Sequence, residues 1–142
     1  MKTLIIVLST FLLSNIIMGS NPIIVTQEEK KEKTEIVLEE GKVNVDKTEH
    51  DFGTIAEDGG KVSTIFTVHN LTEKPILINN VRVSCGCTGP SWSKEPIKPG
   101  KTGEVKITYD PKNRRAPFNK SVIIITDGDP ERITVRIKGV VE

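Results

Sequence analysis

The stretch K-V-S-T-I-F-T-V-H-N, residues 61–70, alternates apolar and polar side chains along its length. One parity forms a candidate core face: Val62, Thr64, Phe66 and Val68. The other parity is polar except for Ile65. Because successive side chains of a strand point to opposite faces of a sheet, this pattern predicts a β-strand with one buried face.

Comparable runs lie on both sides of this stretch, and turn-forming sequences such as K-P-G-K and D-G-D-P separate several of them. The further predicted strands cover residues 48–55, a run from Pro75 that ends near Thr88, and residues 105–109, 121–126 and 133–141. No helical period intervenes. The sequence therefore predicts an all-β fold, an immunoglobulin-like antiparallel β-sandwich of about seven strands, with the last two paired as a hairpin.

The first 20 residues have the form of a secretory signal peptide, in which Lys2 precedes a mostly apolar run from residue 4 to residue 18. This run is shorter than the roughly 20 apolar residues that cross a bilayer, which favours cleavage over a retained membrane anchor. We therefore expect an exported protein, periplasmic or extracellular, with no transmembrane segment in the mature chain. Residues 21–42 are predicted to be a charged flexible tether, and residues 43–142 to be the immunoglobulin-like domain.

Charge and motifs exclude several classes of function. The chain has 20 lysines and arginines against 19 aspartates and glutamates, a net charge of +1, so no strong field attracts nucleic acid. The basic residues of the segment 112–120 are accordingly predicted to form a solvated loop. The sequence has no hydrolase, zinc-protease, phosphate-loop or dinucleotide-binding motif, so we expect a non-catalytic protein without a cofactor.

Several segments, taken in order and spacing, resemble one family. They are H-D-F-G-T-I at 50–55, T-V-H-N at 67–70, S-C-G-C-T at 84–88, I-K-P-G-K at 97–101, G-E-V at 103–105 and I-K-G at 137–139. From about Val43 to Glu142 the chain resembles the bacterial domain-of-unknown-function family numbered 1573, whose members look like the Hydin-type and major-sperm-protein-type immunoglobulin folds. The resemblance implies an exported spacer or interaction module. It also marks Cys85 and Cys87 as motif positions without an established role.

The Cys85-Gly86-Cys87 motif leaves three interpretations open. Both cysteines continue the parity of the predicted core residues Val81 and Val83, which favours buried, inert thiols. The second interpretation is a disulfide between Cys85 and Cys87. An extended strand holds the Cα atoms of residues i and i+2 about 6.5–7 Å apart, at the upper limit for a disulfide, but a kink at Gly86 would shorten this distance and allow a redox role. The third is a Cu(I) site, because soft thiolates suit that ion.

Zinc is not predicted, because zinc requires more ligands than two cysteines. The only histidines, His50 and His69, are distant from the cysteines in sequence and are not spaced as a ligand pair. No nucleic-acid partner is predicted either.

Apolar side chains also occur on the second face of two predicted strands, at Ile76, Ile78, Ile123 and Ile125. We expect them to form an interaction face, covered by a partner protein or by the chain's own segment 36–38. The sequence thus predicts an exported, non-catalytic interaction or spacer module of the bacterial envelope. The alternative is a thiol-dependent redox or Cu(I)-binding protein that uses Cys85, Gly86 and Cys87.

Overall fold

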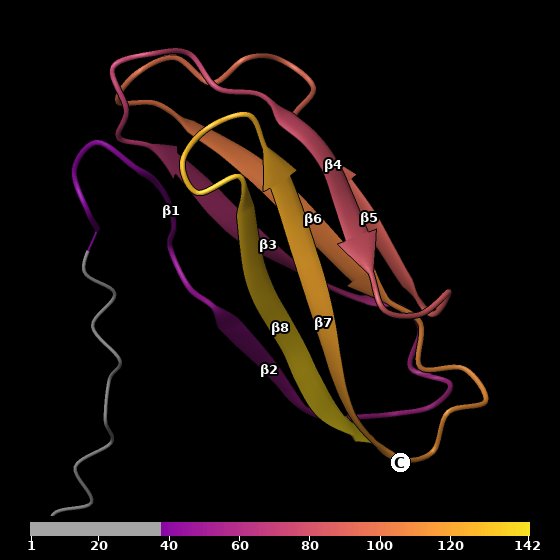
Figure 1. Ribbon diagram of the computed structural model, residues 1–142. Coiled ribbons are helices and arrows are strands. Elements are labelled where there is room, and N and C mark those ends of the chain that lie inside the picture. The colour runs from indigo at the N-terminus through magenta and orange to yellow at the C-terminus, as the bar shows by residue number, and fades with distance from the viewer. Residues whose placement is uncertain (1–37) are drawn as a thin grey trace, which may run out of the picture. The chain divides into compact units, whose positions relative to one another are not determined.

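The computed structural model describes residues 38–142, which form eight β-strands and no helix. The strands are β1 (Val43–Val45), β2 (Glu49–Ile55), β3 (Val62–Asn70), β4 (Ile78–Val83), β5 (Thr88–Trp92), β6 (Thr102–Tyr109), β7 (Pro117–Thr126) and β8 (Arg132–Val141). They make two four-stranded sheets, ordered β1-β3-β6-β5 and β2-β8-β7-β4, that face each other as a sandwich (Figure 1). The predicted all-β, immunoglobulin-like fold is confirmed.

The core lies between the sheets and follows the period of two seen in the sequence. Phe66 and Val68 of β3 and Ile107 of β6 face Ile124 of β7 and Ile137 of β8, and all five side chains are fully buried. Burial of each such side chain contributes about 1.5–3 kcal/mol to folding. Period-two burial therefore both forms the strands and holds the two sheets together.

Strand β8 lies inside its sheet and pairs with two neighbours. It forms the predicted antiparallel hairpin with β7, from Pro117 opposite Val140 to Ile125 opposite Arg132. On its other side it pairs in parallel with the edge strand β2, and the register shifts at Gly53, whose φ is +66°. Glycine adopts this left-handed conformation without steric cost, so it accommodates the β-bulge.

The predicted strand from Pro75 to Thr88 is wrong. The chain forms β4 only from Ile78 to Val83, turns, and begins a separate strand, β5, at Thr88 in the other sheet. Proline and glycine in T-G-P-S-W led us to expect a strand end there, but the segment lies at a sheet edge, where proline's missing N–H is tolerated. The short strand β1 was not predicted.

The predicted interaction face is also wrong in half of its members. Ile76 and Ile78 are core residues, 3% and 2% exposed. The register of β4 against β7 shifts between Ile78 and Asn80, so Asn79 and Asn80 both face solvent. The inward-facing positions before the shift are therefore even-numbered, and those after it are odd-numbered. Ile78 and Val81 thereby point to the same side.

The N-terminal predictions fall largely outside the described residues. This holds for the signal peptide at residues 1–20 and for residues 21–37 of the predicted tether, including Ile36 and Val37. Within residues 38–142, no helix has the length and apolar character needed to span a membrane.

Candidate functional site

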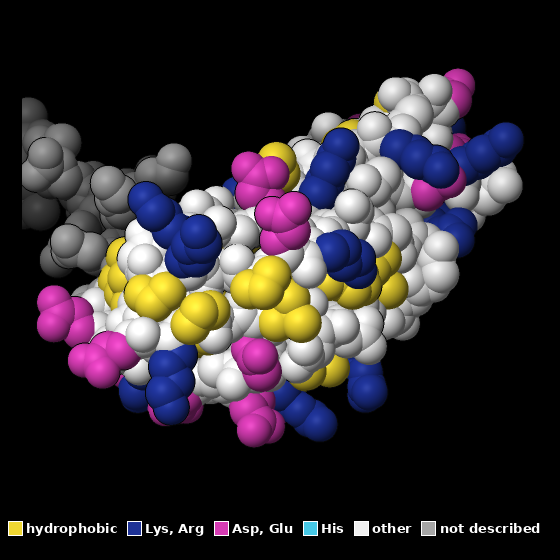
Figure 2. All heavy atoms as spheres, turned by 90° about the horizontal axis from the view of Figure 1, so that it is seen from above, with side chains coloured by type: hydrophobic (Ala, Val, Ile, Leu, Met, Phe, Trp, Pro, Cys, Tyr) yellow, Lys and Arg dark blue, Asp and Glu magenta, His cyan; other side chains and the backbone are white. Residues whose placement is uncertain are grey.

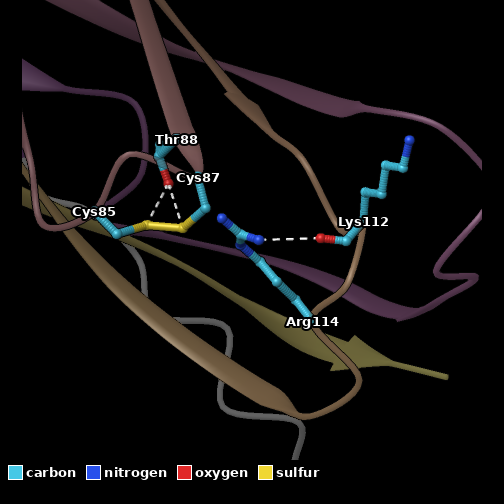
Figure 3. The surroundings of a disulfide bond; sticks show 5 residues. All are labelled: Cys85, Cys87, Thr88, Lys112 and Arg114. Atoms are coloured by element: carbon cyan, nitrogen blue, oxygen red, sulfur yellow. Dashed lines mark hydrogen bonds between the residues drawn. A yellow bond between two sulfur atoms is a disulfide. The ribbon is translucent and has the colours of Figure 1, made fainter.

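The Cys-Gly-Cys motif forms a tight turn where the chain crosses from one sheet to the other. Strand β4 ends at Val83 and β5 begins at Thr88, whose N–H donates to the carbonyl oxygen of Cys85 at 3.3 Å. The turn brings the Cα atoms of Cys85 and Cys87 to 5.3 Å, and the two sulfurs form a disulfide (Figure 3). This separation suits a disulfide, whereas an extended strand would hold the same atoms too far apart.

The structure therefore replaces the interpretation of two packed free thiols with a bridge. Both cysteines of the chain are in it, and neither is free. The parity argument failed because the strand stops before the motif. Cys87 is buried, 6% exposed, against the core, while Cys85 is half-buried at the surface. The two cysteine residues thus differ in exposure.

A buried hydroxyl contacts both sulfurs. The Oγ1 atom of Thr88 lies 3.5 Å from Sγ of Cys85 and 3.8 Å from Sγ of Cys87, and Thr88 is only 5% exposed. Because bridged sulfurs carry no hydrogen, the hydroxyl is the donor in these weak hydrogen bonds. After reduction, the same hydroxyl is placed to donate to a thiolate.

The bridge opens onto a pocket of about 420 Å³ with basic walls. Arg114, Arg115 and Lys120 line it together with the turn, and no acidic residue is among the described residues that do so. The guanidinium of Arg114 is held by a hydrogen bond from Nη1 to the carbonyl oxygen of Lys112 at 3.0 Å (Figure 3). Arg115 donates through Nε to Glu57 at 2.9 Å, which partly neutralises it.

Two stacked aromatic rings form the apolar part of this pocket. Tyr109 of β6 and Phe118 of β7 have ring centroids 4.0 Å apart and nearly parallel planes, 13° from one another. Burial raises the pKa of Tyr109 above its ordinary value, and the nearby charge of Arg114 opposes this rise. The tyrosine therefore stays neutral and contributes an uncharged aromatic wall to the pocket.

The histidines do not join the cysteines. His50 of β2 packs edge-on against the ring of Phe52, 4.5 Å between centroids, and His69 of β3 lies between Asn44 and Thr102 of the neighbouring strands. Neither lines the pocket at the bridge. Residues 38–142 contain no group of three or more histidine, cysteine or acidic side chains able to hold a metal ion.

The remaining predicted residues, Ile123 and Ile125, lie half-buried on the outward face of β7. Register places Ile123 between Arg82 of β4 and Thr134 of β8, and Ile125 between Asn80 and Arg132. All four of these neighbours are exposed. We call this set, with the two isoleucines at its centre, the isoleucine face.

Charge is mixed on the face of the described residues that Figure 2 shows. In Figure 2, lysine and arginine side chains are interspersed with acidic ones, and apolar side chains gather in a band between them. This agrees with the near-balanced composition. The basic pocket is thus a local feature and not part of a general positive field.

Sequence reasoning missed the roles of Thr88 and Arg114. It noted the basic residues of the segment 112–120 but interpreted them as a solvated loop, because nothing in their spacing links them to a motif almost 30 residues earlier. The only sequence indication that Thr88 belongs to the site was its place as the last residue of the motif S-C-G-C-T. The pocket at the bridge depends on the pairing of β5 and β7 with other strands, which composition does not reveal.

Comparison with known proteins supports the fold and gives no activity. The model of the family described as "Protein of unknown function (DUF1573)" matches residues 43–141. Among curated proteins no match was found.

Solved structures share the architecture at low identity. A protein of unknown function from Porphyromonas gingivalis W83 superposes with a TM-score of 0.62 at 18% identity, over 78% of this chain and 51% of that one. The VesB protease of Vibrio cholerae gives 0.59 at 20%, over 70% of this chain and 32% of that one. The chain thus spans about half of the first protein and a third of the second. The PapD-like domain 7 of human CEP192 gives 0.56 at 12%, over 78% and 92%. At these identities the likeness concerns the immunoglobulin-like fold alone.

Proposed function

Because the chain belongs to the DUF1573 family, whose description assigns no function, we propose one from its own residues. The protein is an exported, non-catalytic immunoglobulin-like module of the bacterial envelope that binds another protein. The signal-like residues 1–20 support export, and the disulfide supports an oxidising compartment. Cell fractionation tests export, since recovery of the protein in the cytoplasm would contradict it. Sequencing the N-terminus tests removal of the signal-like segment, since an intact Met1 would contradict cleavage.

The isoleucine face carries the binding proposal. Isoleucines on the solvent side of a sheet leave apolar area exposed, and here Arg82 and Arg132 flank it on both neighbouring strands. An apolar centre with arginine at its border is typical of protein interfaces. The partner that fits presents apolar side chains bordered by carboxylates.

The test compares three isoleucine-to-aspartate variants. Ile123→Asp should remove partner binding and lower the free energy of unfolding by only about 1–2 kcal/mol, because the half-buried side chain lies on the outward face of β7. Ile65→Asp is the matched control: Ile65 is 41% exposed on the outer face of the other sheet and should keep binding. Ile78→Asp, at a core position, should unfold the domain because it buries a charge.

Binding is measured by co-purification from envelope extracts at low and high salt, with sedimentation of the purified protein alongside. A protein retained by wild type and the Ile65 variant, but lost with Ile123→Asp and weakened by salt, supports the proposal. Equal retention by all folded variants contradicts it. Self-association of the wild type that Ile123→Asp abolishes would replace the partner with a second copy of the chain.

A second candidate function is thiol–disulfide exchange at the Cys85–Cys87 bridge. It is favoured by the turn, since a bridge this short joins no distant parts of the fold and opens onto a pocket. Free thiols are counted in the folded protein before and after mild reduction; a bridge that resists reduction until the chain unfolds would refute exchange. The reduced pair also offers the sulfur ligands that Cu(I) prefers, so copper is measured on the same sample.

A further inference from the structure

We infer that the Cys85–Cys87 bridge selects thiols that carry negative charge, and that Cys85 is the sulfur they attack. This deepens the second function proposed above and rests on it. The chemistry recognised is an anionic thiol, either a cysteine flanked by aspartate or glutamate in a protein, or a small free thiol that bears acidic groups. The inference rests on the unequal exposure of the two cysteines and on the charge around them.

Access distinguishes the two sulfurs. Cys87 is 6% exposed, and its backbone carbonyl oxygen accepts a hydrogen bond from the N–H of Asp110 at 2.9 Å, which ties it to the end of β6. Cys85 is half-buried at the start of the turn, and both cysteines line the basic pocket, so Cys85 is the more exposed of the two. An incoming thiolate therefore reaches Sγ of Cys85, and Cys87 becomes the leaving group.

The pocket favours negative charge both before and after this attack. Arg114 and Lys120 carry no ion-pair partner among the described residues, and Arg115 is only partly neutralised by Glu57. Nearby cations stabilise a thiolate, and the hydroxyl of Thr88 donates to the sulfur that leaves. Asp110 lies beside the turn and lines a second pocket together with Gly86 and Cys87, but its carboxylate pairs there with Lys61 at 3.9 Å. Anionic thiols are thus attracted, and the thiolate they release is stabilised.

The chemical step balances as two exchanges. A partner thiolate attacks Sγ of Cys85, the Cys85–Cys87 bond breaks, and Cys87 leaves as a thiolate, which gives a mixed disulfide between Cys85 and the partner. A second partner thiolate attacks the partner sulfur of that mixed disulfide and releases Cys85. Two partner thiols are oxidised to one disulfide, and the protein bridge takes up their two electrons and, from water, two protons.

The experiment measures the rate at which three small thiols reduce the bridge in the full folded chain. The anionic probe is 2-mercaptoethanesulfonate, the neutral probe 2-mercaptoethanol and the cationic probe cysteamine, each rate divided by its thiolate fraction. At about 20 mM salt the anionic probe should react about tenfold faster than the neutral one, with the cationic probe slowest. At about 0.5 M salt the difference should fall to about twofold.

Variants and a peptide complete the test. Arg114→Gln with Lys120→Gln should reduce the anionic preference at least threefold, whereas Lys112→Gln, in the same loop but outside this pocket, should keep it. A peptide Asp-Cys-Asp is compared with Ser-Cys-Ser and with the small anionic probe, which shows whether peptide or free thiol is preferred. Single Cys87→Ser and Cys85→Ser variants show which sulfur is accessible. Each free thiol reacts with an excess of the disulfide of 2-mercaptoethanesulfonate and releases one probe thiolate, and the variant that keeps Cys85 should form this mixed disulfide at least tenfold faster.

The outcomes separate this inference from the function on which it rests. Equal corrected rates for all three probes, or an unchanged preference in the Arg114 and Lys120 double variant, overturn the selectivity and leave exchange intact. Faster adduct formation at Cys87 overturns the assignment of the attacked sulfur. If no probe reduces the bridge before the chain unfolds, exchange itself is refuted.

Discussion

Reduction of the Cys85–Cys87 bridge should cost the fold little. Cross-linking a chain lowers the entropy of its unfolded state by about 2.1 + 1.5R ln n cal/mol/K, where n is the number of residues in the closed loop. With a sequence separation of 2, n is about 3, and the stabilisation is about 1.6 kcal/mol at 25 °C. A loop of about 15 residues would give about 3 kcal/mol. The bridge therefore contributes little to the stability of the fold.

The assay is urea unfolding of the same chain, oxidised or treated with a phosphine reductant, followed by fluorescence of Trp92. The reduced protein should remain folded and lose about 1–2 kcal/mol. By linkage, folding then stabilises the bridge by the same amount, which lowers its reduction potential by only about 35 mV relative to the unfolded chain. A loss above about 3 kcal/mol, or unfolding on reduction, would show that the bridge holds the fold and would refute this reasoning.

Three further predictions concern packing and titration. Asn70→Ala should destabilise the domain by about 3 kcal/mol in urea, because this fully buried amide makes four hydrogen bonds of 2.7–2.9 Å; a loss under 1 kcal/mol would contradict that. Gly139→Ala should cost about 1–3 kcal/mol in the same assay, since a Cβ there would lie 2.9 Å from the Phe118 ring; an unchanged midpoint would refute the clash. Burial, with Lys47 adding to it, lowers the pKa of His50 below its ordinary value, so the unfolded state binds the proton more tightly and stability falls as pH drops below about 6.5. His50→Gln should flatten this slope between about pH 7 and 5.5, whereas a slope that His69→Gln removes instead would contradict the assignment.

The fold was predictable from sequence where one face of a strand is buried and the other is exposed to solvent. In β3, β6 and β8 the period-two pattern gives the strand, its inward face and its core residues, such as Phe66, Ile107 and Ile137. This works because a register error there would move every apolar side chain into water. The Pro99-Gly100 turn was predictable for the same local reason, and Gly100 has the expected positive φ of 72°.

The failures occur where one residue inverts the pattern. A bulge at Asn79 and Asn80 reverses the parity of β4, so Ile78 turned from a predicted surface residue into core. Bulges depend on the partner strand, and sequence alone does not give that partner. The isoleucines of β7 did not suffer this error, because β7 pairs without a shift to β8.

For the candidate site, the sequence predicted the two cysteines but not which of three states they adopt. The motif Cys85-Gly86-Cys87 allowed packed thiols, a disulfide or a Cu(I) site, and the argument that a disulfide needs a kink at Gly86 describes the turn that the structure contains. Which of the three states it adopts depends on where β4 ends. Part of the positive charge at the bridge comes from Arg114. Motif spacing could not predict this contact, because Arg114 is far from the cysteines in the sequence.

The central position of β8 in its sheet has a consequence for how the molecule is made. Ribosomes synthesise the chain from its N-terminus, so β2 and β7 exist before β8, the strand that must lie between them and the last of the eight described strands to emerge. Until that moment both carry unpaired N–H and C=O groups, which attract strands of other chains. The sheet forms only after β8 has emerged, and its non-local pairing makes folding slow. A chain that stops short of Arg132 lacks the strand that joins β2 to the rest, and we expect it to aggregate instead of forming a smaller domain.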